Sequence, residues 1–130
     1  MKIGVLADRD SLDSLVAEDF GHAAFFLIVD SDTLDYTVVE NEYAKGDGAG
    51  YKVAEAIVPT GVSHVVCGGI GMHGLEILQK GGIRVWYDMD EMTVEEAVEH
   101  IKQRVRRPPT RNAVDLYYLS RSCRYEPTWH

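Results

Sequence analysis

The chain has few cysteines and few basic residues, and each shortage excludes a class of protein. Its 130 residues include two cysteines, Cys67 and Cys123, too few for a disulfide framework and without the paired spacing of a zinc site. The 13 lysines and arginines against 21 acidic residues give a net charge of -8. Because nucleic acids bind proteins through neutralised phosphates, we expect no nucleic-acid partner.

The chain also lacks a long hydrophobic run. The longest uncharged apolar stretch, residues 23–29, is far shorter than the roughly 20 residues that span a bilayer. The opening Met1-Lys2-Ile3 leads directly into a strand-like segment without a signal-peptide pattern. Since 45% of the residues are apolar, the chain has the material for a core. We therefore expect a cytoplasmic domain with no membrane partner.

Charge divides the chain into two unequal parts. Residues 1–105 carry eight basic and 19 acidic side chains, whereas residues 106–130 carry five arginines and two acids. The prolines of Arg106-Arg107-Pro108-Pro109 cannot continue a helix, so we predict a domain over 1–105 and a basic, aromatic C-terminal tail over 106–130. Residues 112–119 are too apolar for water and too few for a core of their own. We expect the tail to dock on the body or on a neighbouring copy, which would give a homodimer.

Apolar periodicity in the body predicts alternating strands and helices. Strands are expected at 2–7, 25–30, 36–40, 64–67 and 83–86, and helices near 50–58, 72–80 and 93–105. Thr93 and Glu96 have the spacing of a capping box at the start of the last helix.

This order of elements predicts where a ligand would bind. A hairpin followed by alternating helices and strands indicates an α/β sheet, mostly parallel in its second half, with helices on both faces. Ligands in such sheets collect beyond the carboxyl ends of the strands. We therefore expect a site formed by residues 7–11, 67–73 and 86–90.

The loop before the helix at 72–80 is rich in glycine. Gly69, Gly71 and Gly74 match the G-x-G-x-x-G fingerprint, with Asp88 and Asp90 about 20 residues further on, where a ribose-binding acid is expected. The chain has no room for a second nucleotide-binding half, and such turns also occur for packing, so nucleotide binding is one alternative. More generally, free amides at a helix start attract anions. Residues 46–52 miss the Walker spacing and are not a P-loop.

Several motifs, in order, resemble one known family. They are Leu12-Asp13-Ser14, Phe20-Gly21-His22-Ala23, Phe26-Leu27-Ile28-Val29-Asp30, Gly48-Ala49-Gly50, Cys67-Gly68-Gly69-Ile70-Gly71, Gly81-Gly82-Ile83-Arg84-Val85 and Thr93-Val94-Glu95-Glu96-Ala97. Over residues 1–103 the chain resembles the dinitrogenase iron-molybdenum cofactor biosynthesis family, which includes NifX, NifY, the C-terminal domain of NifB and the orange protein. The resemblance implies a three-layer α/β/α, ribonuclease H-like fold with a five-stranded mixed sheet. It also implies carriage of an anionic metal-sulfur cluster, with proteins of metallocluster biosynthesis as partners, rather than catalysis.

Two stretches of the chain depart from that family's pattern. The family often shows His-Phe-Gly-Arg where this chain has Asp19-Phe20-Gly21-His22, and often has a histidine in place of Asp47. Aspartate is a hard oxygen ligand and suits a sulfide cluster less well than cysteine or histidine. The choice between an iron-molybdenum and a molybdenum-copper type of cluster therefore stays open.

A metal-sulfur cluster is large, soft and anionic, so an acidic protein must supply local positive potential for it. The residues expected to contact the cofactor are Arg9, His22, Gly69, Ile70, Gly71 and Met72, and those expected to bind metal are Cys67 and His73. Each also has a simple structural interpretation. Cys67 fits a buried thiol, Arg9 a loop charge, His22 a surface residue and Met72 a core residue.

Enzymatic functions find little support in the residues. A nuclease needs several convergent carboxylates and a basic channel for its substrate, and the chain is acidic throughout its body. No Ser-His-Asp or Cys-His arrangement is identifiable by spacing. We therefore predict a protein that is not an enzyme, with an interaction module without a cofactor as the main alternative to cluster binding.

Overall fold

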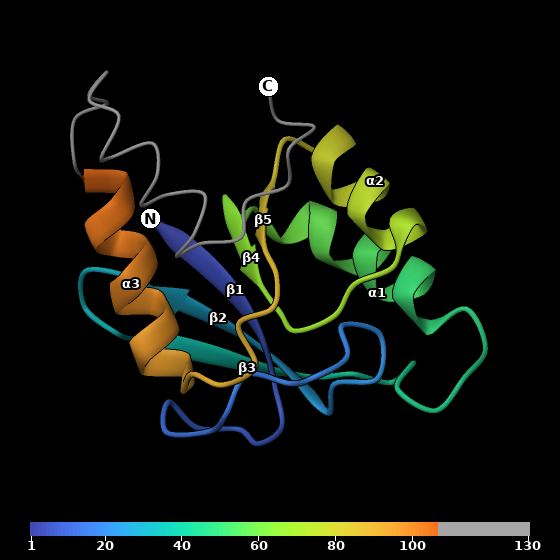
Figure 1. Ribbon diagram of the computed structural model, residues 1–130, viewed down its shortest axis with the longest axis horizontal. Coiled ribbons are helices and arrows are strands. Elements are labelled where there is room, and N and C mark those ends of the chain that lie inside the picture. The colour runs from blue at the N-terminus through green and yellow to red at the C-terminus, as the bar shows by residue number, and fades with distance from the viewer. Residues whose placement is uncertain (107–130) are drawn as a thin grey trace.

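The apolar segment Lys2–Ala7 forms the central strand β1 in the computed structural model, which describes residues 1–106. The sheet has the order β3-β2-β1-β4-β5 (Figure 1). Strands β2 (Phe25–Asp30) and β3 (Tyr36–Glu40) form the expected antiparallel hairpin, and β2 is antiparallel to β1. On the other side, β4 (His64–Val66) and β5 (Arg84–Trp86) follow β1 in parallel. The predicted mixed sheet is confirmed.

Helices cover both faces of this sheet. Helices α1 (Ala49–Ile57) and α2 (Met72–Lys80) lie on one face, and α3 (Val94–Arg106) lies on the other (Figure 1). A short 3-10 helix, η1 (Val58–Thr60), follows directly after α1. The three-layer α/β/α class is therefore confirmed, and each predicted strand and helix agrees with the structure to within one residue at either end.

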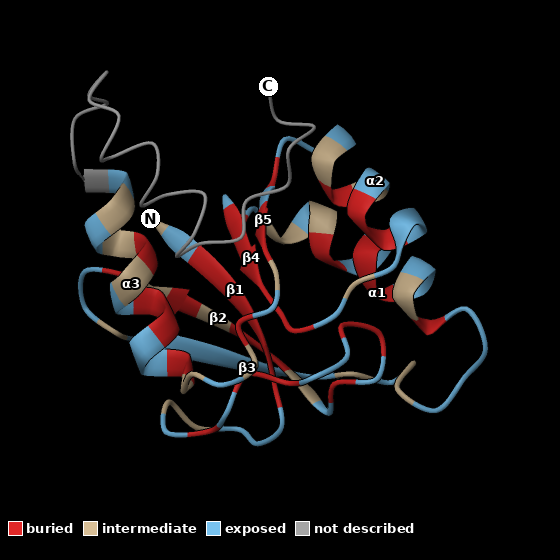
Figure 2. Cartoon of the chain, in the orientation of Figure 1, coloured by how far each residue is buried: buried red, intermediate tan, exposed pale blue. Residues whose placement is uncertain are grey.

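The sheet separates two hydrophobic cores. Leu6 and Leu78 belong to the core under α1 and α2, whereas Val5 and Val98 belong to the core under α3. Adjacent residues of β1 thus enter opposite cores, because successive side chains of a strand point to opposite faces. This explains why a central strand reads as a continuous apolar run. Figure 2 shows β1 buried along its length after its exposed first residue, and β3 exposed throughout.

The segment between β1 and β2 has no regular secondary structure, yet it positions the candidate site. It pairs with β1 through the bridge Ala7↔Val16 and with the start of α3 through Leu15↔Thr93. It then reaches the loop after β4 through the bridge Asp19↔Gly69. Residues 15–19 therefore run across the carboxyl ends of β1 and β4, where the site was expected.

Helix α3 begins with the predicted capping box. The Thr93 amide donates to Glu96 Oε1 at 2.9 Å, and the Glu96 amide donates to Thr93 Oγ1 at 3.1 Å. Hydrogen bonding by the amide of Thr93, and then by its side chain, lowers the pKa of the Glu96 carboxyl. The next two amides donate to carbonyl groups of the segment between β1 and β2. The Val94 amide donates to the Ser14 carbonyl, and the Glu95 amide donates to the Leu12 carbonyl. The start of α3 is thus fully hydrogen-bonded.

The predicted C-terminal tail begins where α3 ends. Residues 107–130, on which the tail prediction depends, lie outside the described part of the chain. Within residues 1–106, no helix is both long and apolar enough to cross a membrane.

Candidate functional site

The glycine-rich loop after β4 is held by the backbone of residues 17–20. The Gly68 amide donates to the Ala17 carbonyl at 3.0 Å, and the Gly69 amide donates to the Glu18 carbonyl at 2.6 Å. A Cβ atom on Gly68 would lie 2.4 Å from the Glu18 carbonyl oxygen, so only glycine fits there. Since these two amides already have acceptors, they are not available to a phosphate, which counts against the nucleotide-binding alternative.

The first turns of α1 and α2 lie against each other beside the loop at Phe20-Gly21. A Cβ atom on Gly74, in the first turn of α2, would lie 3.3 Å from the Gly50 carbonyl oxygen in the first turn of α1. A Cβ atom on Gly21 would lie 2.6 Å from the Gly50 amide nitrogen. Glycines at these positions therefore allow three backbone segments to approach one another.

Both of these helices begin at a glycine and without a capping side chain. Gly48 precedes α1 with φ 70°, a left-handed conformation that favours glycine, and Gly71 precedes α2. Neither first turn contains an acidic residue. The first amides that bond back to the helix are those of Lys52 and Leu75, so the preceding amides have no partner within their helix. Two partially positive helix ends thus meet at one edge of the molecule.

His22 is exposed beside these helix starts and is oriented by a carboxylate. Its Nδ1 lies 2.7 Å from Asp19 Oδ2, while Asp19 Oδ1 accepts a hydrogen bond from the Gly21 amide at 3.1 Å. A histidine that binds metal commonly donates its other ring nitrogen to a carboxylate in this way. With Nδ1 on Asp19, Nε2 of His22 is the atom left to face a ligand.

The first two residues of α2 present their side chains to solvent. His73 is exposed, and Met72 is 69% exposed. The interpretation of Met72 as a core residue is therefore wrong, because the helix turns its buried face, Leu75 and Leu78, toward the sheet. The thioether of Met72 is a soft metal ligand, and the imidazole of His73 is a ligand of intermediate softness. Both suit a sulfide-bridged metal cluster.

A comparison with protein families places the chain. The model of the family described as dinitrogenase iron-molybdenum cofactor matches residues 1–104. The chain belongs to this family. No curated protein matches it.

Solved structures similar to this member of the family include two related proteins. The apo form of the orange protein from Desulfovibrio gigas is 31% identical, with a TM-score of 0.74, covering 85% of this chain and 93% of that one. A Thermotoga protein assigned to NifB and to the DUF35 family, solved by NMR, is 28% identical with a TM-score of 0.66. That similarity covers 78% of this chain and 87% of the Thermotoga chain. Both likenesses extend over nearly the whole described domain.

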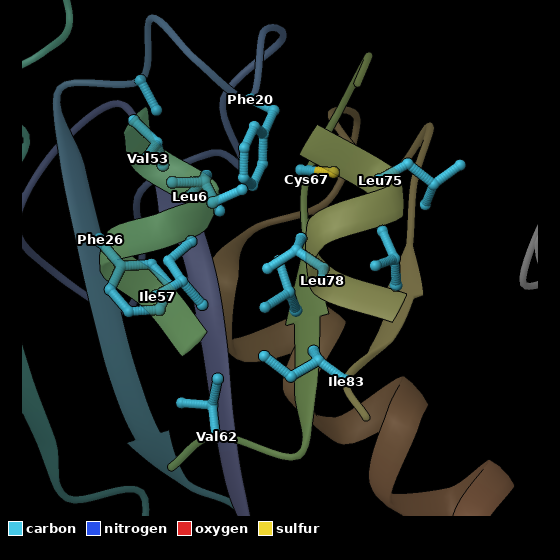
Figure 3. Close-up of a cluster of buried hydrophobic side chains, with 14 of the residues drawn as sticks. Leu6, Phe20, Phe26, Val53, Ile57, Val62, Cys67, Leu75, Leu78 and Ile83 are labelled. Atoms are coloured by element: carbon cyan, nitrogen blue, oxygen red, sulfur yellow. The ribbon is translucent and has the colours of Figure 1, made fainter. Parts of the chain in front are cut away.

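Cys67 lies inside the core of this family member. Its side chain is fully buried among apolar neighbours, next to Leu75 (Figure 3). Burial raises the pKa of the Cys67 thiol, and the carboxylates of Asp88, Asp19 and Asp90 raise it further. The thiol is therefore neutral and shielded, as its interpretation as a buried thiol requires, and its replacement would disturb packing.

Arg9 lies on the other face of the sheet from the start of α2. Its loop packs against the start of α3, where the carbonyls of Leu12 and Ser14 accept hydrogen bonds from backbone amides of that helix. The guanidinium donates to the Asp13 carbonyl oxygen at 3.2 Å, and the Arg9 amide donates to Ser14 Oγ. The edge of the sheet at the carboxyl ends of its parallel strands therefore brings together His22, His73 and the starts of α1 and α2. Arg9 instead forms hydrogen bonds within its own loop.

Two residues near the site were not singled out in the sequence. Lys52 adds positive charge in the first turn of α1, with Nζ 5.9 Å from the centre of the Tyr43 ring. Lys52 has no role of its own among the sequence-based predictions, although a lysine after a glycine-rich helix start is a recognisable signal for anions. Asn41 donates through Nδ2 to the carbonyls of Gly21 and Ala23, and no local pattern indicates such a distant partner.

The donors present do not form a preassembled metal-ion site. Within residues 1–106, no group of three or more His, Cys, Asp or Glu side chains is arranged to hold a metal ion. The arrangement instead offers uncapped amides, two exposed imidazoles and a thioether around open space. A Cβ atom on Gly48, Gly50 or Gly71 would meet no heavy atom within 4 Å. Such a surface fits a bulky anion better than a single ion.

Proposed function

We propose that this protein holds an anionic metal-sulfur cluster as cargo and acts as an accessory in iron-molybdenum cofactor assembly. The observation that carries the proposal is the meeting of two glycine-started helix ends, α1 and α2, beside His22 and His73. The protein binds and releases this cargo without changing a covalent bond in it, and it acts on proteins of cofactor assembly by delivering or receiving the cluster.

Electrostatics favours the helix starts over the end of β4. The carboxylates of Asp88, Asp19 and Asp90 all act on the Cys67 thiol, so negative charge is concentrated above that strand end. An anionic cargo is repelled there and attracted to the uncapped amides of α1 and α2, with Lys52 close by. The cargo therefore lies over the start of α2, where it contacts the amides and the side chains of Met72 and His73. Cys67 does not contact the cargo.

Ligation to the cluster is assigned to the exposed donors. His22 supplies Nε2, because Asp19 holds Nδ1, and His73 supplies an imidazole from the first turn of α2. Met72 adds an exposed thioether next to His73. Asp19 and His22 stand at the first and last positions of the family's His-Phe-Gly-Arg pattern. They are each other's partners, and together they provide one oriented ligand.

The similar proteins support the same function. The family is described by the iron-molybdenum cofactor, one structural relative is the apo form of the orange protein, and the other is assigned to NifB. An apo form is defined by a ligand that the protein can take up. A shared fold over most of the chain makes uptake of a related cluster the function that best fits the open helix starts.

Anaerobic reconstitution tests this proposal. The purified full chain is incubated with iron, molybdate and sulfide, and separately with copper, molybdate and sulfide, then desalted and analysed for metal, sulfide and visible absorption. We expect the wild type to retain a coloured cluster, and a His22→Ala/His73→Ala variant to retain about tenfold less. Lys80→Ala, an exposed change at the far end of α2, is the matched control and should retain as much as the wild type.

Two outcomes would contradict the proposal. Equal retention by the double variant and the wild type would show that these imidazoles are not ligands. A wild-type protein that stays colourless and metal-free in both mixtures would favour the interaction module without a cofactor.

A further inference from the structure

Strand β3 leaves an unusually apolar edge on the sheet. It pairs with β2 on one side, and within residues 1–106 no strand pairs with its other side. All five of its side chains are exposed, including Tyr36 at 41%, Val38 at 38% and Val39 at 43%. Natural proteins usually protect such edges with charge, proline or a bulge, because an open edge pairs with other strands. We therefore expect another segment to cover this edge of the sheet.

An apolar pocket adjoins the end of β3. It has a volume of about 120 Å³ and lies between the segment Val39 to Tyr43 and helix α1, with Phe26, Val53 and Ile57 in its wall. A dry cavity of about 150 Å³ accommodates benzene, so this pocket has the size of a single ring or branched side chain. An occupant that follows β3 can place one bulky apolar side chain there.

Charge narrows the choice of occupant. Residues 30–42, which include β3, contain five acidic side chains and no basic one. A second copy of residues 30–42 would bring the same five acids near the pairing, and like charges across a strand pair are destabilising. The surface instead favours an extended segment that is both apolar and basic.

The chain itself contains such a segment. Residues 107–130 carry four arginines and two acids, and residues 113–119 include Val114, Leu116, Tyr117, Tyr118 and Leu119. The segment starts on the side of the β2–β3 turn. A hydrogen bond from the Asp32 amide lowers the pKa of Asp30, at the end of β2, and Lys102 of α3 lies near enough for its charge to lower that pKa further. Leu34 in the same turn packs against the core under α3. Seven residues after Arg106 span up to about 24 Å, and a strand of five residues measures about 17 Å. Length and starting point therefore both allow the segment to lie along β3.

We infer that residues 113–119 of the same chain add to the outer edge of β3 as a further strand, with Tyr117 or Tyr118 in the pocket beside Val39. The added strand pairs with the backbone of Tyr36–Glu40, and the arginines flanking the segment face the acids of the hairpin. The exposed valines and tyrosine of β3 are then covered. This inference is independent of the proposed cargo.

A spin label on Cys123 tests the position of the segment in the full chain. Cys67 is buried, so a thiol-directed label attaches to Cys123. We expect the label to broaden the NMR signals of residues 39–43 at least twofold more than those of Gly81-Gly82-Ile83, at the opposite edge of the sheet. Unchanged signals at 39–43, or stronger broadening near β5, would overturn the inference.

Hydrogen exchange provides a second measurement that does not depend on the label. In the full chain we expect the amides of β3 to exchange about tenfold faster after Tyr117→Ser/Tyr118→Ser/Leu119→Ser. Trp129→Ser, another aromatic change in the same part of the chain, is the control and should leave β3 unchanged. Equal exchange in the wild type and triple variant would contradict strand addition. Protection that rises with protein concentration would assign the segment to a neighbouring copy and would also overturn the inference.

Discussion

The two faces of the sheet treat their helix starts in opposite ways. On one face, α3 begins with a capping box, has Glu95 and Glu96 in its first turn, and has its first amides hydrogen-bonded. On the other face, α1 and α2 begin at glycines, with no capping side chain and no acid. Compared with glycine, a capping side chain would stabilise each of these helices by a few tenths of a kcal/mol. The uncapped face thus has helix starts whose first amides have no partner within their helix.

The same contrast extends to the buried polar groups. On the α3 face, Trp86 Nε1 donates to His64 Nδ1 at 3.0 Å inside the core, and the His100 ring packs edge-on against Trp86. On the α1 and α2 face, the imidazoles of His22 and His73 are exposed. Histidines therefore serve packing on one face and are available to ligands on the other.

The largest expected effect comes from the loop that leads into α2. Gly68→Ala should lower the free energy of unfolding by about 2–4 kcal/mol, because the added Cβ would lie 2.4 Å from the Glu18 carbonyl oxygen. Gly71→Ala is the control, since a Cβ there meets nothing within 4 Å. Urea denaturation of both variants measures the difference. Equal stabilities would show that residues 17–20 do not hold the loop.

Acid should destabilise the protein through the α3 face. Burial, with the charges of Arg84 and the amino terminus, lowers the pKa of His64 to about 4. An unfolded histidine titrates near 6.5, so the unfolded chain binds this proton first. The stabilisation is complete above pH 6.5 and is lost as the pH falls toward 4, by about 2 kcal/mol. Burial also lowers the pKa of His100, which acts in the same direction.

Urea denaturation between pH 7 and 4 checks this window. His64→Gln should make the profile flatter while leaving the contribution of His100 in place. Met72→Ala, an exposed change of a side chain that does not titrate, lies on the other face and is the control; it should leave the slope of the wild type unchanged. A profile that is as steep without His64 as with it would contradict the assignment.

A smaller effect is expected at the capped helix. Thr93→Ala removes the hydroxyl that accepts the Glu96 amide, so the free energy of unfolding should fall by about 1 kcal/mol. Cluster retention should not change, because α3 lies on the other face. Thermal unfolding and anaerobic reconstitution of the same preparation measure the two quantities. A loss of retention equal to that of the histidine variant would remove the distinction between the faces.

The smallest change in stability should come with a large change in binding. Gly71→Asp places a capping carboxylate at the start of α2, where φ -79° and ψ 165° suit an N-cap residue. We expect the protein to become about 0.5–1 kcal/mol more stable, through the cap and through the negative charge at the helix start. We also expect it to retain less cluster, because the carboxylate repels an anion. Gly71→Ser caps without charge and is the matched control. A stabilised Gly71→Asp variant that binds normally would disprove the role of this helix start.

Local sequence signals predicted most of the fold. The capping box at Thr93 and the glycines around α2 act within a few residues, so their consequences follow from the order of residues along the chain. The irregular segment between β1 and β2 was not predicted, because its bridges join Leu15 to Thr93 and Asp19 to Gly69. Such pairings have no periodicity that a linear pattern can reveal.

The candidate site was predicted in its general position and only partly in its residues. His22, His73 and Gly71 lie where an edge of parallel strands places them. Cys67 is buried, in agreement with its interpretation as a buried thiol, whereas Met72 is exposed and is not the core residue that its simple structural interpretation predicted. One residue of shift between a strand and a helix turns a side chain into the core or out of it, and no local signal fixes that rotation.

The sequence by itself determined the family, the order of strands and helices, and the glycines that leave two helix starts uncapped. These features depend on composition, spacing and backbone freedom, which act locally. Only the tertiary structure decided that the two starts meet, that Asp19 orients His22, and that Arg9 lies on the opposite face. The meeting of the two starts joins residues distant in the chain, and it arises when the sheet and its two cores bring their segments into contact. Asp19 and His22 are near neighbours in sequence, but their irregular loop is fixed by its bridge from Asp19 to the distant Gly69.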